Sequence, residues 1–407
     1  MTRPRMVPAL VAALLTWVAP GRAQPADEPP PRLTASAVLD PAVRQGPHHR
    51  VDEDIATEGY FHRFGVTSTF GPFEAIGRSQ LAVRLHEIQA LAALQDVSKT
   101  EVFLAAAGQS VVRIGQSAAA VVTDPVASAK NLGGGIKRCG VNLGRRTQRA
   151  VASASDDGAP APAGGGAAGS ILGVTSAARR WAQKVGVDPY TTNPVLRQAL
   201  TDIAKVDAAG SIATKVVVPV PQLVGMTSTV GGLVWGSDPE EVRKVNEQRL
   251  RELSVPKPAV AALSANSWFT LTYQTRLIAA LHAVAVAGVA DYVQSAAGAS
   301  SEREALFFVE SAEMLQQRHG KRPVTGVLAD SRAMVAAGGD AIEILLPLDW
   351  IGMTAATQSA LQDIGRRAPG ELGPGRLVIV TTGRVSTRAQ REIASAGWVI
   401  SSPATTR

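Results

Sequence analysis

Residues Val187 to His319 constrain the fold most, because apolar residues recur there at the spacing of an α-helix. The clearest stretch is Ser300 to Arg318. One face of it carries the apolar side chains Ala305, Phe308, Val309, Ala312 and Leu315. Glutamate and glutamine lie off that face, as in an amphipathic helix. The pattern therefore predicts a body of packed helices in the centre of the chain.

The pattern changes after Pro323, where short apolar runs alternate with helical stretches. We predict strands at Val324–Ala329, Ala333–Ala337, Ala341–Leu346, Leu377–Val380 and Trp398–Ser401. We predict helices at Ala355–Arg367 and Thr387–Ser395. Such alternation is typical of parallel strands joined by right-handed crossovers. The predicted fold class is therefore mainly α, a multi-helix body with a small C-terminal α/β unit.

A chain of 407 residues is too long for one compact core, so we expect several units. A proline-rich leader precedes a predicted helix from Phe73 to about Ala107, and a run of alanine, glycine, proline and serine around Gly164–Gly166 marks the main boundary. The expected segments are a signal peptide (1–23), a disordered leader (24–45), an N-terminal helical segment (46–125), a basic Gly-rich loop and linker (126–170), a central helical domain (171–322) and the small α/β domain (323–403).

The stretch from Met1 to Ala23 has the three parts of an export signal. Arg3 and Arg5 precede an apolar run from Val7 to Val18, and Gly21-Arg22-Ala23 fits a cleavage site. An N-terminal membrane anchor is the alternative, but the run is shorter than the ~20 residues that span a bilayer. We therefore expect an exported protein, periplasmic or extracellular, with no transmembrane helix in the mature chain.

Positive charge is concentrated in one glycine-rich segment. The formal net charge is +7, and the three arginines of the predicted signal account for part of it, which leaves +4. The cluster consists of Lys130, Lys137, Arg138, Arg145, Arg146 and Arg149, with no acidic residue between Asp124 and Asp156. Such a segment suits an anionic lipid, lipopolysaccharide or an acidic polymer. No aromatic residue is present for base stacking, so nucleic acid is not the expected partner. A solvated linker is the alternative.

Cys139 is the single cysteine, so no internal disulfide can form. It either cross-links two copies or is a small residue in a tight loop.

Three positions in the helical body are candidates for chemistry. Glu310 and Glu313 lie three residues apart on one helix and could act as an acid and base pair. His282 is the only polar residue in the stretch from Leu277 to Ala290, which fits a helix buried on all sides. The alternatives are solvated surface carboxylates and a hydrogen-bonded core histidine.

Polar groups also follow the predicted C-terminal strands, where ligands bind in sheets of this kind. Asp330 and Asp349 are the catalytic candidates there. Thr381, Thr382, Arg384 and Ser386 form a predicted anion site, in which Ser386 caps the last helix. The alternative is that these are ordinary loop and cap residues.

We expect neither a metal nor a cofactor. The polar run with His48, His49, Asp52, Glu53, Asp54 and His62 lacks the spacing that places ligands around one ion. The sequence contains no GxSxG, no HExxH and no SxxK in a credible context.

Together these features favour an exported, non-enzymatic envelope-associated protein that contacts anionic surfaces through the basic Gly-rich loop. The alternative is an exported hydrolase for an anionic substrate, with Asp330, Asp349 and Arg384 at the strand ends. A third hypothesis is a scaffold that binds protein partners through the central helices, which would show as an exposed apolar patch.

Overall fold

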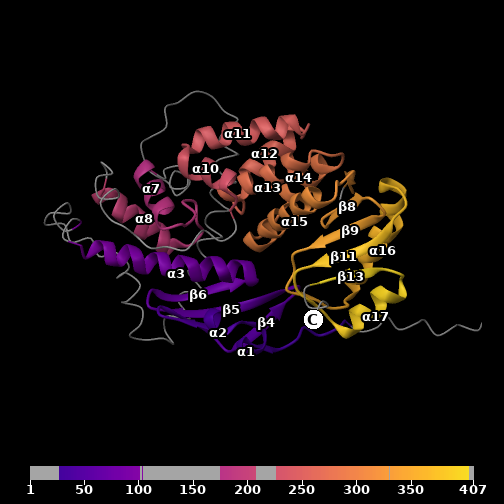
Figure 1. Ribbon diagram of the computed structural model, residues 1–407, viewed down its shortest axis with the longest axis horizontal. Helices are drawn as coiled ribbons and strands as arrows, with labels where there is room; N and C mark the ends of the chain where they lie inside the picture. Colours follow the sequence, from indigo (N-terminus) through magenta and orange to yellow (C-terminus); the bar gives the residue numbers. More distant parts are fainter. Residues whose placement is uncertain (1–26, 101–102, 104–174, 208–225, 330, 403–407) are drawn as a thin grey trace, which may run out of the picture.

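The computed structural model describes residues 27–100, 103, 175–207, 226–329 and 331–402 (Figure 1). An antiparallel sheet near the N-terminus, a central group of helices and a mixed sheet near the C-terminus make up this part of the chain. Helix α3 lies between the N-terminal sheet and helices α7, α8 and α10 (Figure 1). The predicted signal peptide, the basic Gly-rich loop and Cys139 lie outside the described residues.

The N-terminal sheet has the strand order β1-β4-β5-β3-β2, and β6 also pairs with β5. Its strands are β1 (Leu33–Thr34), β2 (Gln45–Gly46), β3 (His49–Val51), β4 (Asp54–Glu58), β5 (Phe61–Ser68) and β6 (Gly71–Ile76). All pairings are antiparallel. On β5 the buried residues His62, Phe64 and Val66 alternate with more exposed ones, so one face joins the core. Two helical turns, α1 (Ala35–Val38) and α2 (Pro41–Arg44), connect β1 to β2.

The central helices follow on from this sheet. They are α3 (Arg78–Ser98), α7 (Ser176–Lys184), α8 (Pro194–Val206), α10 (Ser228–Gly236), α11 (Pro239–Glu252), α12 (Lys257–Ala265), α13 (Leu271–Val284), α14 (Val289–Ala297) and α15 (Glu302–Lys321). Asn193 before Pro194 and Asp238 before Pro239 predict the caps of α8 and α11, and both are confirmed. The Asn193 side chain accepts from Val195 N at 3.0 Å, and the Asp238 side chain accepts from Glu240 N at 3.0 Å.

The C-terminal sheet has the order β13-β11-β9-β8-β7. Its strands are β7 (Gly326–Val327), β8 (Met334–Gly338), β9 (Ala341–Leu346), β11 (Arg376–Thr381) and β13 (Val399–Ser401). β7, β8 and β9 pair antiparallel, whereas β9, β11 and β13 pair parallel. α16 (Ala355–Leu372) and α17 (Thr387–Ser395) connect the parallel strands, and β10 (Trp350–Ile351) pairs with β12 (Arg384–Val385).

Two shared cores hold these layers together. Phe64 of the N-terminal sheet is buried with Ile88 of α3 and Trp181 of α7. Leu345 of the C-terminal sheet is buried in one cluster with Phe308 of α15. Each sheet therefore buries one face against central helices, and neither has a core of its own on that side.

The predicted fold class, mainly α with a small C-terminal α/β unit, is wrong. The antiparallel sheet over residues 33–76 occupies a region for which we predicted a disordered leader and helices. The C-terminal sheet is not a separate unit either, because its strands share a hydrophobic core with α13, α14 and α15. These strands are hard to predict because β1, β2 and β3 have only two or three residues each, and β4 and β5 alternate over few positions.

Three local predictions also need correction. The helix predicted from Phe73 begins only at Arg78, because Phe73 is in β6 and Gly77 has a left-handed φ of 94°. The leader expected to lack structure contains β1, α1 and α2, and its Ala35 is fully buried. The glycines and prolines between Val216 and Trp235 predict a buried irregular loop or a short strand, but the described part of this stretch forms α10 from Ser228 onward.

The turn between β4 and β5 contacts the segment that precedes β10. The Tyr60 carbonyl accepts hydrogen bonds from Asp349 N at 3.1 Å and Trp350 N at 3.0 Å. The Asp349 carboxylate accepts from His62 N at 2.9 Å. Strand β5 is thereby fixed to the segment before β10. Within the described residues, no helix has the length and apolar character needed to span a bilayer.

Candidate functional site

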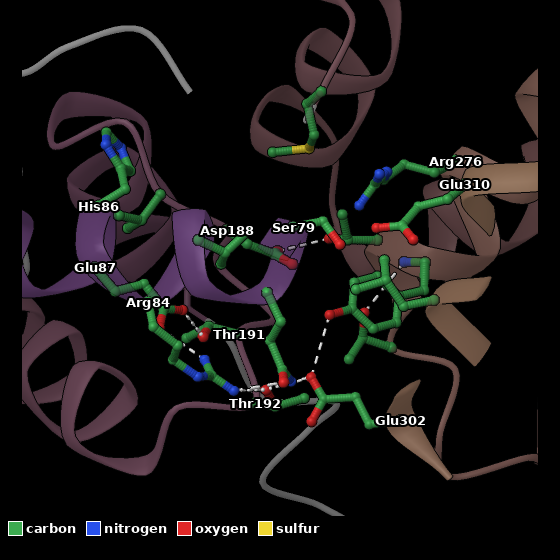
Figure 2. Close-up of a pocket in the computed structure, with 18 residues that line it drawn as sticks. Ser79, Arg84, His86, Glu87, Asp188, Thr191, Thr192, Arg276, Glu302 and Glu310 are labelled. Carbon is green, nitrogen blue, oxygen red and sulfur yellow. Dashed lines mark hydrogen bonds and ion pairs between the residues drawn. The ribbon is translucent and has the colours of Figure 1, made fainter. Parts of the chain in front are cut away.

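A cavity of about 80 Å³ lies where α3, α13 and α15 meet the loop between α7 and α8 (Figure 2). The polar and charged side chains that line it are Ser79, Gln80, Arg84, His86, Glu87, Asp188, Thr191, Thr192, Thr270, Thr272, Tyr273, Arg276, Glu302 and Glu310. A charged group that is shielded from water needs a partner of opposite charge, or its pKa changes. The partners of each group therefore determine what the cavity can bind.

Glu87 of α3 is the most enclosed carboxylate of the cavity, with 2% of its surface exposed. Its Oε2 pairs with Arg84 Nη1 at 2.7 Å, an i,i+3 contact on the same helix. Asn193 Nδ2 donates to the same oxygen at 3.0 Å, and Thr191 Oγ1 donates to Oε1. Because Asn193 also caps α8, this network ties the start of α8 to the middle of α3.

Glu302, in the first turn of α15, closes the lower side of the cavity in Figure 2. Its Oε1 accepts from Thr192 Oγ1 at 2.8 Å and from Tyr273 Oη at 3.2 Å, and it lies 3.8 Å from Arg84 Nη2. Burial raises the pKa of Tyr273, and the nearby Glu302 carboxylate adds to the effect. The Tyr273 hydroxyl therefore stays protonated and acts as a donor.

Two further ion pairs lie on the α13 and α15 side. Arg276 binds Glu313 with two bonds, Nε to Oε1 at 2.8 Å and Nη2 to Oε2 at 2.9 Å. Arg303 pairs with Glu310 and also donates to Ser79 Oγ at 3.1 Å. Burial raises the pKa of Glu310, although the Arg303 charge opposes the shift.

Asp188 differs from these groups, because no ion pair within the described residues includes it. Thr272 Oγ1 donates to its Oδ1 at 2.6 Å and Tyr190 N at 2.8 Å. Burial raises the pKa of Asp188 from 3.8 to about 6, against the lowering effect of these two hydrogen bonds. Its carboxyl group can therefore gain or lose a proton near neutral pH.

Carboxyl groups outnumber guanidinium groups around the cavity. The carboxyl groups are Glu87, Asp188, Glu302, Glu310 and Glu313, and the guanidinium groups are Arg84, Arg276 and Arg303. Each of these arginines has a close carboxylate partner, and Asp188 has no ion-pair partner in the described part of the chain. A positive charge that entered the cavity would therefore be attracted most strongly toward Asp188.

We expect the stability of the protein to fall between pH 4 and pH 6 because of Asp188. Its folded-state pKa of about 6 lies above the unfolded value of 3.8, so the folded state holds the proton over that interval and the unfolded state does not. The contribution is fully present below pH 3.8 and lost as the pH rises through 6. It amounts to about 2–3 kcal/mol.

Urea unfolding of the wild type and of Asp188→Asn from pH 3.5 to 7.5 measures this effect. The variant should gain stability relative to the wild type across that window. Asp96→Asn, which changes an exposed carboxylate at the end of α3, provides the matched control and should show no such gain. Parallel curves for wild type and Asp188→Asn would show that the carboxyl group titrates normally.

The predicted carboxylate pair on α15 is divided between two arginines. Glu310 lines the cavity and binds Arg303, whereas Glu313 binds Arg276. His282 lies elsewhere, on a partly exposed side of α13, where Nε2 is 2.6 Å from Glu252 Oε2. The stretch around His282 is not a helix buried on all sides, because α13 ends at Val284 and Ala285 has a left-handed φ of 47°.

None of the described strand-end residues is among those that line the cavity. The buried Asp349 carboxylate accepts from Arg78 N at 3.3 Å as well as from His62 N. Thr382 Oγ1 donates to Leu348 O at 3.1 Å, Thr381 is buried and Arg384 is exposed. Ser386 caps α17, as predicted, by accepting from Ala389 N at 2.9 Å. Asp330 and the basic cluster Lys130, Lys137, Arg138, Arg145, Arg146 and Arg149 lie outside the described residues.

The histidines near the N-terminus have structural partners. His62 Nδ1 lies 2.9 Å from Thr57 Oγ1, and His49 Nε2 lies 3.2 Å from Val43 O. In the part of the chain that the structure describes, no group of three or more His, Cys, Asp or Glu side chains is placed to hold a metal ion.

No protein-family model, curated protein or solved structure matches this chain.

The sequence alone does not single out Glu87, Asp188 and Tyr273 as site residues. They belong to three separate segments, and only the folded chain brings them together. One signal is present in the sequence, since Thr191, Thr192 and Asn193 form a polar run just before α8. Such a run predicts a helix cap, but it does not say which distant carboxylates it will bind.

Proposed function

We propose that this chain is an exported binding protein that takes the positively charged head group of a small ligand into the cavity at Asp188. The observation that carries the proposal is a carboxyl group with no ion-pair partner among the described residues, in a cavity where the other carboxylates have arginine partners. An ammonium or guanidinium group would supply that partner.

The geometry suits a head group of this kind. Both hydrogen bonds to Asp188 reach Oδ1, which leaves Oδ2 for a donor from the ligand. Tyr273 also lines the cavity, and aromatic faces attract cations. Glu302 lines the cavity and adds negative charge.

The size of the cavity limits the ligand. An engineered protein cavity of roughly 150 Å³ holds benzene, and this one has about half that volume at about 80 Å³. It therefore accommodates a head group of a few heavy atoms and not a large molecule. The remainder of a longer ligand would extend out of the cavity.

Thermal unfolding with small probes tests the proposal. Ethylammonium chloride at ten times its Kd should stabilise the wild type by about 1.4 kcal/mol, which is a shift of a few degrees in Tm. Ethanol and sodium propionate, of similar size but neutral or negative, should have no such effect. Potassium chloride at equal ionic strength corrects for screening.

Two variants separate binding at Asp188 from a general effect of the amine. Asp188→Asn should lose the shift, because the amide lacks the negative charge. Asp96→Asn, on the exposed end of α3, should keep it. An equal shift in Asp188→Asn, or stabilisation by propionate, would refute the proposed site.

Contact with anionic surfaces and hydrolysis of an anionic substrate are two other proposals for this chain. Contact of the basic Gly-rich loop with anionic surfaces concerns residues that the structure does not describe. The hydrolase hypothesis needs Asp330, which is also outside the described residues, and Asp349, whose carboxylate accepts two backbone N–H groups. Among the described residues, the large exposed apolar side chains are Trp268 and Val399, and they belong to different segments.

A further inference from the structure

A carboxylate from the start of the described chain is bound between the N-terminal ends of α16 and α17. Glu28 Oε2 accepts from Met353 N at 2.8 Å and from Ser386 Oγ at 2.6 Å. Glu28 N donates to Met353 O at 3.0 Å. Met353 and Ser386 lie 325 and 358 residues from Glu28 along the chain. The contact is therefore not a consequence of local turn geometry.

The preceding residue binds in the same way. Asp27 Oδ1 accepts from Ala355 N at 2.7 Å, at the first residue of the 18-residue helix α16. The first N–H groups of a helix lack partners within it, and the helix dipole favours negative charge at that end. Two adjacent carboxylates thus occupy backbone donors at Met353 and Ala355.

Ser386 is oriented to donate a hydrogen bond to a carboxylate between α16 and α17. It is 3% exposed, and its oxygen accepts from Ala389 N while its hydroxyl donates to Glu28. One side chain therefore caps α17 and binds the carboxylate at once. Among the four residues of the predicted anion site, Ser386 is the one that contacts this carboxylate.

We infer that the N-terminal ends of α16 and α17 form a binding site for an acidic peptide, and that the Asp27-Glu28 segment of the chain is its resident occupant. The ligand is an extended segment with two adjacent carboxylates, held through the backbone amides of Met353 and Ala355 and the hydroxyl of Ser386. Asp27 is exposed and Glu28 partly so. The occupant therefore lies at the surface, where it can leave without disturbing the core.

Peptide binding to the full chain tests the inference. The probe is an acetylated, fluorescently labelled peptide with the sequence of residues 27–32, and fluorescence anisotropy measures its binding. The double variant Asp27→Ala/Glu28→Ala should bind it at least about tenfold more tightly than the wild type, because a segment bound nine-tenths of the time lowers the apparent affinity about tenfold. Glu58→Ala, which changes an exposed carboxylate on β4, should behave like the wild type.

The charge of the peptide provides the second comparison. A peptide with Asn and Gln in place of Asp and Glu should bind the double variant at least about tenfold more weakly, because it lacks the charge-assisted hydrogen bonds. Equal binding of the two peptides, or no gain over the wild type, would overturn the inference.

Hydrogen exchange gives a measurement that does not depend on the peptide. The amides of Met353 and Ala355 should exchange at least about tenfold faster in the double variant than in the wild type. Adding the acidic peptide should slow them again. Unchanged exchange at both amides would show that the carboxylates are not bound there.

Discussion

Glu87→Ala is expected to lower the free energy of unfolding by about 3–5 kcal/mol, because it removes one partner from a buried ion pair. Arg84, 8% exposed, would keep its charge without its closest carboxylate. Thr191 and Asn193 would each lose an acceptor as well. The cost arises mainly from these unpaired groups and less from the attraction that is lost.

Urea unfolding followed by circular dichroism measures this loss, with Lys99→Ala as the control. Lys99 and Asp96 form an ion pair at the end of the same helix, but their side chains are 65% and 77% exposed. Removing that pair should cost less than about 1 kcal/mol. Similar small losses in both variants would mean that Glu87 is not part of a buried network.

Phe64→Ala is expected to cost about 3–5 kcal/mol, because it leaves a cavity between the N-terminal sheet and α3. Phe64 has no exposed surface and belongs to the same core as Ile88 and Trp181. A loss of this size would show that β5 packs against the central helices through Phe64. The helical segment predicted for this region does not require Phe64 to be buried.

Thr67→Ala on the same strand is the matched control, because Thr67 is exposed. Its effect should stay within about 0.5 kcal/mol. Equal stability losses for Phe64→Ala and Thr67→Ala would contradict the alternation of buried and exposed residues along β5.

Local signals in the sequence correctly predict where α8 and α11 begin. Asn193 before Pro194, and Asp238 before Pro239, each combine a cap with a residue suited to the first helical turn, and both helices begin there. The strands predicted at Ala333–Ala337 and Ala341–Leu346 are also confirmed, and they pair as an antiparallel hairpin around Gly339, which has a left-handed φ of 64°. These features depend on residues that are close together in the sequence, so they can be predicted from one sequence.

Features set by distant residues could not be predicted in this way. β4 and β5 alternate polar and apolar residues over only a few positions each, and β5 gains its stability from pairing on both edges. The cavity needs α3, α13 and α15 together, although Arg84 and Arg276 lie far apart in the sequence. The polar character of Asp188 is visible in the sequence, but its position in the cavity is not.

The pKa of Asp188 in the presence of a small amine tests the central claim most directly. ¹³C-carboxyl NMR of the labelled protein, with Asp188→Asn to assign the signal, gives this pKa between pH 4 and pH 8. Without ligand we expect a value of about 6. With saturating ethylammonium we expect a lower pKa, because a bound positive charge favours the carboxylate. An unchanged pKa at saturating ethylammonium, with potassium chloride as the ionic-strength control, would contradict the proposed cation site.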